Sequence, residues 1–281
     1  MRAILNEVPA PLRADLDRLC GVIAAHGPMA VAFSGGVDSG LLAYVAHRVL
    51  GDRMTCVVGV SASLAAGEER GAIAFLERHG IPHARVETRE MDDPAYRANG
   101  PDRCYRCKHE LFARIASSPH AARFPRIAYG ANVDDLSDFR PGARAASERG
   151  VVAPLAEADF DKARIRETAR ALGLALWDKP AAPCLASRVP YFSAVTPENL
   201  RRIELAEGAL DALGFASRRV RDHGALARVE LPLAEHPRAR SAAIWREIEN
   251  RLRAAGYERV ELAPDGLCSG RLNEALRAGE A

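Results

Sequence analysis

One short run of residues limits the possible folds of this chain more than any other feature. An apolar stretch at 29–33 leads directly into Ser34-Gly35-Gly36-Val37-Asp38-Ser39. The stretch predicts a buried strand, the paired glycines a tight turn, and the residues from Ser39 onward a helix. This order can gather backbone N–H groups and the positive end of a helix dipole around one anion. The run therefore predicts a phosphate-binding loop, although it lacks the Walker pattern.

The segments around this loop alternate between the two kinds of secondary structure. Strands are expected near 29–33, 54–60, 84–87 and 126–130, and helices near 11–26, 39–50, 66–79, 104–117 and 160–172, with a further apolar segment at 151–155. Such alternation predicts an α/β fold with a doubly wound parallel sheet. Ligands of these sheets collect at the carboxyl ends of the strands, where the predicted loop would lie.

The pattern changes near residue 190. Thr196 and Pro197 predict a capped helix start, and that helix continues to about 213. A hairpin around His223-Gly224, a helix at 238–254 and a strand at 257–263 follow. We therefore expect two domains, a larger one over 1–190 and a smaller α+β domain over 191–281.

Composition excludes several classes of protein. Hydrophobic residues make up 48% and charged residues 27% of the 281 residues, as in ordinary globular proteins, and the net charge is only +2. No apolar run is long enough to span a bilayer, and the first residues do not resemble a secretory signal. Six cysteines are too few for a disulfide framework in a chain of this length, which favours a reducing, cytoplasmic location. We expect neither a nucleic acid nor a membrane as partner.

A second motif follows the predicted strand at 126–130. Gly130, Asn132 and Asp135 form a G-x-N-x-x-D pattern that would lie beside the first loop. A turn capped by Asn and Asp is the alternative explanation. In the first loop, Ser34 and Ser39 offer hydroxyl groups, while Asp38 could orient a nucleotide or help to hold magnesium.

Three cysteines stand out from the others. Cys104 and Cys107 are spaced to share a metal, yet no second pair completes a zinc site, so either a third cysteine joins them at a cluster or the pair only begins a helix. Cys184 lies in a proline-rich loop with Arg188 and Lys179 nearby, and such cations favour the reactive thiolate form. Cys56, in contrast, lies within an apolar strand and is expected to be structural.

These motifs carry two resemblances. The loop at 34–39 resembles the phosphate loop (PP-loop) of the N-type ATP pyrophosphatases, which form an adenylate and release pyrophosphate. More narrowly, the segments 102–108, 183–191 and 266–273 resemble the LarE family of ATP-dependent sulfur transferases, which act in making the nickel-pincer nucleotide cofactor. The resemblance extends from about residue 12 to residue 274.

The resemblance implies a role for each motif. ATP, with Mg²⁺, would bind at Ser34, Gly35, Gly36, Asp38, Ser39, Gly130, Asn132 and Asp135. The enzyme would adenylate a carboxylate of pyridinium-3,5-biscarboxylic acid mononucleotide and replace an oxygen by sulfur, with Ser187 and Arg188 at the reacting site. The sulfur would come from Cys184 itself or from sulfide on a [4Fe-4S] cluster held by Cys104, Cys107 and Cys184. Arg219 and Arg221 alternate on one strand face, and we expect at least one of them to contact the substrate phosphate. The alternative is a basic hairpin that is merely exposed to solvent. Family members form homo-oligomers, often hexamers.

Other functions are compatible with the first loop alone. A tRNA thiolase would need a strongly basic face, and an amidating enzyme similar to NAD or GMP synthetases would need an ammonia source. We find neither feature in the sequence. A non-enzymatic alternative is a nucleotide-binding regulator, or a module in which the three cysteines hold a structural metal.

Overall fold

The computed structural model of the protein describes residues 2–136 and 141–268. The chain divides into two compact units that interleave along the sequence. The first comprises Met1–Ser61, Ala66–Glu90 and Asp102–Ala182, and the second comprises Ala62–Ala65, Met91–Pro101 and Pro183–Ala281.

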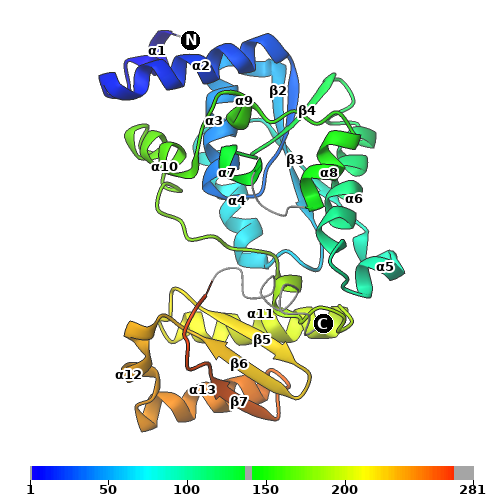
Figure 1. Cartoon of the computed structure of the whole chain (residues 1–281), viewed down its shortest axis with the longest axis vertical. Coiled ribbons are helices and arrows are strands. Elements are labelled where there is room, and N and C mark those ends of the chain that lie inside the picture. Colours follow the sequence, from blue (N-terminus) through cyan, green and yellow to red (C-terminus); the bar gives the residue numbers. More distant parts are fainter. Residues whose placement is uncertain (1, 137–140, 269–281) are drawn as a thin grey trace. The chain divides into compact units, whose positions relative to one another are not determined.

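A parallel sheet forms the centre of the first unit. Within the described residues its four strands are β1 (Met29–Ala32), β2 (Met54–Val60), β3 (His83–Glu87) and β4 (Arg126–Tyr129), in the order β3-β2-β1-β4 (Figure 1). All neighbouring strands run parallel. The chain moves outward from β1 to β3 and then returns to the other side of β1. Ligands of open α/β sheets bind at such a reversal, here between β1 and β4.

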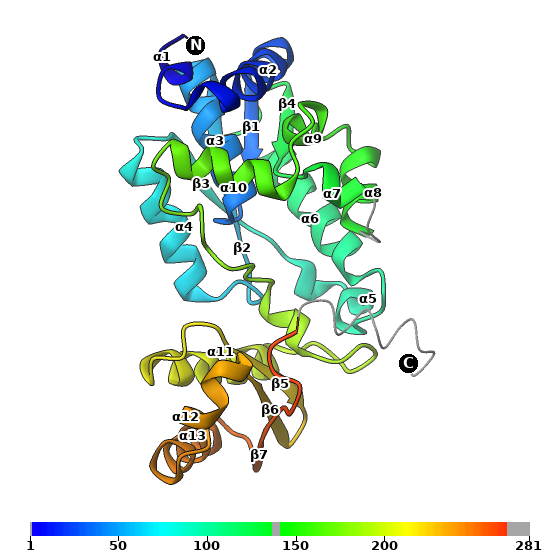
Figure 2. The same ribbon diagram turned by 60° about the vertical axis from the view of Figure 1, so that its left-hand side comes forward.

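Helices cover both faces of this sheet (Figures 1 and 2). They are α1 (Arg2–Leu5), α2 (Ala10–His26), α3 (Val37–Leu50), α4 (Ala66–Arg78), α6 (Arg103–Ser117), α7 (Val133–Leu136), α8 (Pro141–Glu148), α9 (Pro154–Glu157) and α10 (Lys162–Ala171). Successive residues of β1 point to opposite faces, as a pleated strand requires. Met29 and Val31 pack with α2, α3 and α10, whereas Ala30 and Ala32 pack with Phe112 of α6. The predicted α/β fold with a doubly wound parallel sheet is confirmed.

The second unit has its own sheet and core. β5 (Arg219–His223) and β6 (Leu226–Glu230) are antiparallel, and β7 (Arg259–Leu262) adds to β6 in parallel. The helices of this unit are α5 (Pro94–Arg97), α11 (Pro197–Ala212), α12 (His236–Ala239) and α13 (Ala242–Ala254). Leu210, Phe215 and Leu252 are fully buried in the core between helices and sheet. Thr196 begins α11 with the predicted cap, because its side chain accepts the Asn199 N–H while the Asn199 side chain accepts the Thr196 N–H.

Two predictions about local structure were wrong. The helix expected over 238–254 is broken, because Ser241 has an extended backbone at the start of α13 and its hydroxyl donates to the Arg238 carbonyl. The hairpin turn, expected around His223-Gly224, lies one residue later at Gly224-Ala225, because His223 pairs with Leu226. The apolar segment at 151–155 forms only a one-residue parallel bridge from Val152 to Ala128 before α9 begins.

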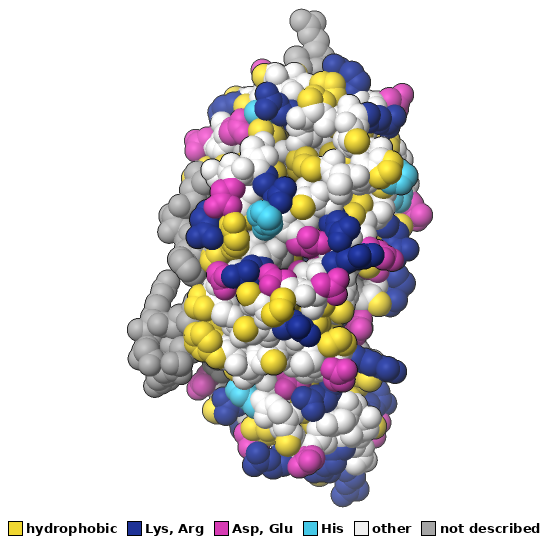
Figure 3. Space-filling model, turned by 90° about the vertical axis from the view of Figure 1, so that its right-hand side faces the viewer, with side chains coloured by type: hydrophobic (Ala, Val, Ile, Leu, Met, Phe, Trp, Pro, Cys, Tyr) yellow, Lys and Arg dark blue, Asp and Glu magenta, His cyan; other side chains and the backbone are white. Residues whose placement is uncertain are grey.

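Charged groups of both signs are mixed on the surface drawn in Figure 3. On the face in Figure 3, Lys and Arg side chains alternate with those of Asp and Glu. Among the described residues, no helix combines the length and the apolar character needed to cross a membrane.

Candidate functional site

The loop after β1 folds as its small residues dictate. Gly35 has a φ of +72°, which side-chain-bearing residues rarely adopt, and a Cβ added to it would lie 3.0 Å from the Ala72 Cβ of α4. The Ser34 N–H donates to the Ser39 hydroxyl oxygen at 3.2 Å, and the Ser39 hydroxyl donates to the Gly36 carbonyl at 3.1 Å. These bonds close the loop over the first turn of α3, so that it surrounds the positive end of that helix.

The end of β4 lies against this same turn. A Cβ added to Gly130 would be 2.8 Å from the Ser39 nitrogen and 3.1 Å from the Asp38 carbonyl carbon. Only glycine lets the two backbones approach so closely. The structure therefore brings the two predicted motifs together at the reversal of the sheet.

Asp38 is the centre of a polar cluster beside the loop. Asn132 donates its amide to Asp38 Oδ1 at 3.2 Å, and the Lys162 ammonium donates to Asp38 Oδ2 at 2.5 Å. The Asp38 and Lys162 side chains remain 22% and 41% exposed, so an incoming ligand can reach both charges. If the Lys162 ammonium binds a polyphosphate instead, the Asp38 carboxylate can bind a cation in its place.

Asp135 forms a reciprocal pair of hydrogen bonds with Asn132. Its carboxylate accepts the Asn132 N–H at 3.1 Å, while the Asn132 side-chain oxygen accepts the Asp135 N–H at 3.2 Å. This reciprocal pair caps the short helix α7. Asp135 thereby fixes Asn132, which in turn contacts Asp38.

Two lysines contact the loop, and sequence reasoning identified neither contact. Lys162 occupies the first position of α10, where the helix dipole disfavours a cation. A lysine at such an unfavourable position is the sequence signal that could have indicated a functional role. Lys179, expected to act on Cys184, donates to the Gly35 carbonyl at 2.9 Å and to Glu68 at 2.7 Å. It therefore braces the phosphate loop against α4.

Cys104 and Cys107 lie in the first turn of α6 in the first unit. Cys104 is exposed and Cys107 is half-buried. Cys184, which is also exposed, belongs to the second unit. Among the residues that the structure describes, no three His, Cys, Asp or Glu side chains are grouped to hold a metal. Thiols are nevertheless the donors that iron–sulfur clusters require, so the chemistry of the three residues fits such a cluster.

Cys184 precedes a single 3-10 turn, η3 (Leu185–Arg188). Arg188 is only 6% exposed and makes a bidentate ion pair with Glu207 of α11 at 2.8 and 2.9 Å. Its remaining donors reach the Pro183 and Cys184 carbonyls and the Ser187 hydroxyl. Arg188 thus holds the backbone of 183–188, here called the Cys184 loop, and it is itself held by Glu207, a partner that no sequence motif indicated.

Arg219 and Arg221 share one face of β5, as predicted, and both are buried. Arg221 is paired with the fully buried Glu230 at 3.0 and 3.1 Å and donates to the Ser187 carbonyl at 2.8 Å. Arg219 donates to the Cys268 carbonyl at 2.8 Å. Burial, together with the nearby Arg221 and Arg188 charges, lowers the pKa of Arg219.

Counted over the described residues, this buried cluster has more positive than negative groups. Two carboxylates, Glu207 and Glu230, offset two of the three guanidinium groups in this cluster, and among the described residues no carboxylate lies within 4 Å of Arg219. A buried cation of this kind attracts an anion. Of the motif at 266–273, only Gly266 to Cys268 are described; 269–273 lie outside the described residues.

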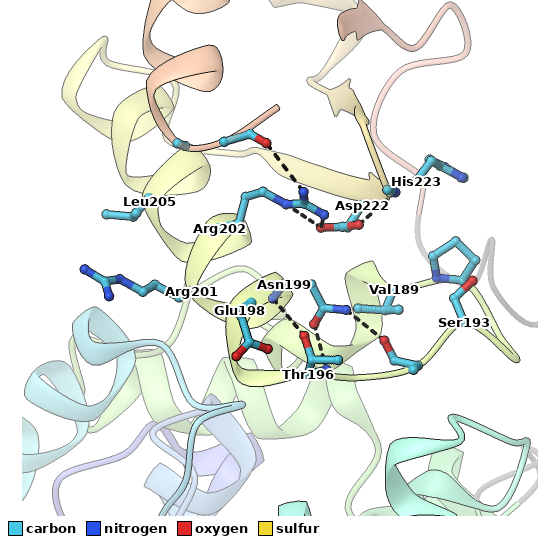
Figure 4. A pocket seen from close by; sticks show the side chains of 15 residues that line it. Val189, Ser193, Thr196, Glu198, Asn199, Arg201, Arg202, Leu205, Asp222 and His223 are labelled. Atoms are coloured by element: carbon cyan, nitrogen blue, oxygen red, sulfur yellow. Dashed lines mark hydrogen bonds and ion pairs between the residues drawn. The ribbon is translucent and has the colours of Figure 1, made fainter. Parts of the chain in front are cut away.

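A separate pocket of about 890 Å³ opens in the second unit (Figure 4). It lies between the segment at 189–196, α11 and the end of β5. Arg202 and Asp222, which both line the pocket, form an ion pair at 2.6 Å. The Tyr257 hydroxyl donates a further hydrogen bond to the Asp222 carboxylate. None of the residues predicted as functional lines this pocket.

Comparison with known proteins identifies the family. No protein-family model matches the chain. An uncharacterized protein of Synechocystis is 42% identical over 88% of this chain and 92% of its own length. The pyridinium-3,5-bisthiocarboxylic acid mononucleotide synthase of Lactiplantibacillus plantarum is 36% identical over 88% of this chain and 89% of its own length. A GMP synthase of Corynebacterium diphtheriae is 36% identical over only 27% of this chain and 14% of its own length.

The similarity to the synthase extends over nearly all of both chains, whereas that to the GMP synthase is confined to a short stretch. The loop and cysteine motifs resemble those of the same family. The chain therefore belongs to the LarE family of sulfur transferases and is an enzyme.

Proposed function

We propose that this enzyme uses ATP to activate a carboxylate of pyridinium-3,5-biscarboxylic acid mononucleotide and then replaces one carboxylate oxygen by sulfur. The observation that carries this proposal is the 36% identity to the synthase over nearly its whole length. The phosphate loop between β1 and β4 supports the first half-reaction, and the exposed Cys184 supports the second.

In the first half-reaction, the substrate carboxylate attacks the α-phosphorus of ATP and pyrophosphate leaves. The loop N–H groups and the α3 N-terminus would stabilise the negative charge of the phosphates. The Lys162 ammonium would exchange its hydrogen bond to Asp38 for one to a phosphate oxygen. Asp38, freed from Lys162, would then be the ligand for Mg²⁺, the hard cation that carboxylates bind. Asn132 would keep the Asp38 carboxylate oriented during this exchange.

In the second half-reaction, a sulfur nucleophile attacks the acyl carbon and AMP leaves with its bonding electrons. If Cys184 is the donor, its thiolate forms a thioester. Removal of the Cys184 Cα proton then breaks the C–S bond, which leaves a thiocarboxylate and dehydroalanine. Arg188 and Ser187 would hold the loop during these steps, because Arg188 contacts the carbonyls of Pro183 and Cys184 and the Ser187 hydroxyl.

The alternative sulfur source is a [4Fe-4S] cluster held by Cys104, Cys107 and Cys184. When bound, such a cluster would supply exchangeable sulfide at an iron that has no protein ligand, so the enzyme would not be consumed. Two of the three thiols, those of Cys104 and Cys184, are exposed, and thiols are the donors that such a cluster requires.

The second unit would bind the substrate. The excess positive charge on Arg188, Arg219 and Arg221 suits the phosphate of a mononucleotide, because one guanidinium group can donate two parallel hydrogen bonds to two phosphate oxygens. The first unit, with the loop at 34–39, would bind ATP. We extend this assignment to the two domains expected from the sequence, 1–190 and 191–281.

The experiment that tests this function separates the two half-reactions. Wild-type enzyme and the Cys184→Ala variant are mixed with ATP, Mg²⁺ and the dicarboxylate mononucleotide, and pyrophosphate and thiocarboxylate are measured. We expect Cys184→Ala to release pyrophosphate in a substrate-dependent manner but to form no thiocarboxylate, with Cys268→Ala as the matched control of normal yield. An unchanged thiocarboxylate yield in Cys184→Ala would remove Cys184 from the mechanism.

A further inference from the structure

Two short segments far from Cys184 in the sequence belong to the same compact unit as the Cys184 loop. They are Ala62–Ala65 and Met91–Pro101, which leave the first unit after β2 and after β3. The first carries Ser63, and the second carries Tyr96 and Asn99. All three side chains are buried, with at most 2% of their surface exposed. Buried polar groups are retained where their hydrogen bonds fix a structure.

Ser63 and Tyr96 contact the residue after Cys184 through a short chain of hydrogen bonds. The Leu185 N–H donates to the Ser63 carbonyl at 2.8 Å. The Tyr96 hydroxyl, in turn, donates to the Ser63 hydroxyl oxygen at 3.1 Å. The hydroxyl of Tyr96 therefore helps to fix Ser63, and the carbonyl of Ser63 fixes the N–H of Leu185.

The carbonyl on the other side of the same peptide is also held. The Cys184 carbonyl accepts the Ser187 N–H at 2.9 Å and the Arg188 guanidinium at 3.3 Å. Both polar groups of the Cys184–Leu185 peptide are thus bonded, in opposite directions. Because a peptide is planar, these bonds hold the plane that follows Cys184, which restricts its ψ angle and the position of its Cβ.

Asn99 holds the segment that follows. Its side-chain nitrogen lies within 3.3 Å of the Val189, Pro190 and Ser193 carbonyl oxygens. The main-chain carbonyl of Asn99 accepts the Phe192 N–H. The same excursion, Met91–Pro101, therefore anchors the chain beyond the Cys184 loop. The loop is held at its start by Ser63 and after its end by Asn99.

We propose that Ser63 and Tyr96 are positioning residues for Cys184, and that their hydrogen bond orients the Cys184 sulfur toward the activated acyl group. The inference rests on the proposed function, because it assumes that sulfur transfer passes through Cys184. Misplacement of a reacting group by about 1 Å can cost on the order of a hundredfold in rate. Loss of the Ser63–Tyr96 bond should therefore slow sulfur transfer and leave adenylation unchanged.

The test uses Tyr96→Phe and Ser63→Ala, separately and together. Tyr44→Phe is the matched control, since the Tyr44 hydroxyl accepts a hydrogen bond from Arg48 in the first unit. Two quantities are measured: the hydrogen-exchange rate of the Leu185 amide, and the ratio of thiocarboxylate to pyrophosphate formed. We expect each single variant to accelerate Leu185 exchange and to lower the product ratio by about tenfold. The double variant should show the same exchange rate and the same product ratio as each single variant, because all three lack the hydrogen bond between Tyr96 and Ser63.

Wild-type product ratios in both single variants would overturn the inference, as would an unchanged Leu185 exchange rate. The ratio discriminates positioning from general stability, since a globally destabilised enzyme loses pyrophosphate release as well. If wild-type enzyme forms no thiocarboxylate while Tyr96→Phe still accelerates Leu185 exchange, the fixed geometry at Cys184 stands and the proposed function fails.

Discussion

Replacing Gly130 by alanine perturbs the contact that brings the two halves of the phosphate site together. The new Cβ would lie 2.8 Å from the Ser39 nitrogen, and the atoms around it belong to the backbone of α3, which cannot rotate away. To reach the 3.4 Å of ordinary contact, the end of β4 and the first turn of α3 must move apart by about 0.6 Å.

This displacement has two measurable costs. Overpacking at a well-packed site lowers the free energy of unfolding by about 1–3 kcal/mol. Because a shift of about 1 Å in a reacting group can cost roughly a hundredfold in rate, we expect substrate-dependent pyrophosphate release to fall about tenfold. The assay is pyrophosphate release as a function of ATP concentration, with urea unfolding on the same samples.

Gly71→Ala in α4 is the matched control. A Cβ at Gly71 meets nothing within 4 Å, so this variant should keep normal activity and gain up to about 1 kcal/mol in stability. Wild-type kinetics for ATP in Gly130→Ala would refute the argument that this contact shapes the nucleotide site.

The other predictions concern single charges and thiols. Lys162→Met should lower pyrophosphate release by at least about tenfold, because the phosphates lose a cation; normal release would show that the bond to Asp38 is only structural. Glu207→Gln should lower the free energy of unfolding by about 3 kcal/mol in urea titrations, since it leaves Arg188 buried and unpaired; a loss below about 1 kcal/mol would contradict this. Burial raises the pKa of the Cys20 thiol from 9.0 to about 11. Below pH 9 the thiol is neutral in both the folded and the unfolded chain, whereas between pH 9 and pH 11 it ionises only in the unfolded chain. The free energy of unfolding, measured by urea titration, should therefore fall from pH 9 toward pH 11, and less steeply in Cys20→Ala.

The parts of the fold and site that the sequence predicted are local ones. The run from Met29 to Ser39 specifies strand, turn and helix through neighbouring residues, so it could be recognised without the structure. The heptapeptide strand β2 was predicted at its observed bounds for the same reason, because an unbroken apolar run lies between turn residues.

The unpredicted parts depend on contacts between distant residues. Whether Arg188 faces Glu207 or solvent is decided by the packing of η3 on α11, and nothing near Arg188 in the sequence encodes it. The same holds for Ser63 and Tyr96, which look like ordinary loop and helix residues until the fold brings them to the Cys184 loop. Ser241 was a local signal, since serine is a favoured helix start, and there the error lay in the interpretation of the sequence.

The measurement that tests the central claim most directly is product analysis by mass spectrometry after a single turnover. Enzyme purified without oxygen is mixed with ATP, Mg²⁺ and pyridinium-3,5-biscarboxylic acid mononucleotide. The account predicts that one oxygen of a carboxylate is replaced by sulfur, with AMP and pyrophosphate formed in equal amounts. Dehydroalanine at Cys184 would identify the cysteine as donor, and an intact Cys184 in iron- and sulfide-containing enzyme would identify the cluster. An amidated product, or ATP cleavage that does not depend on the mononucleotide, would contradict the account.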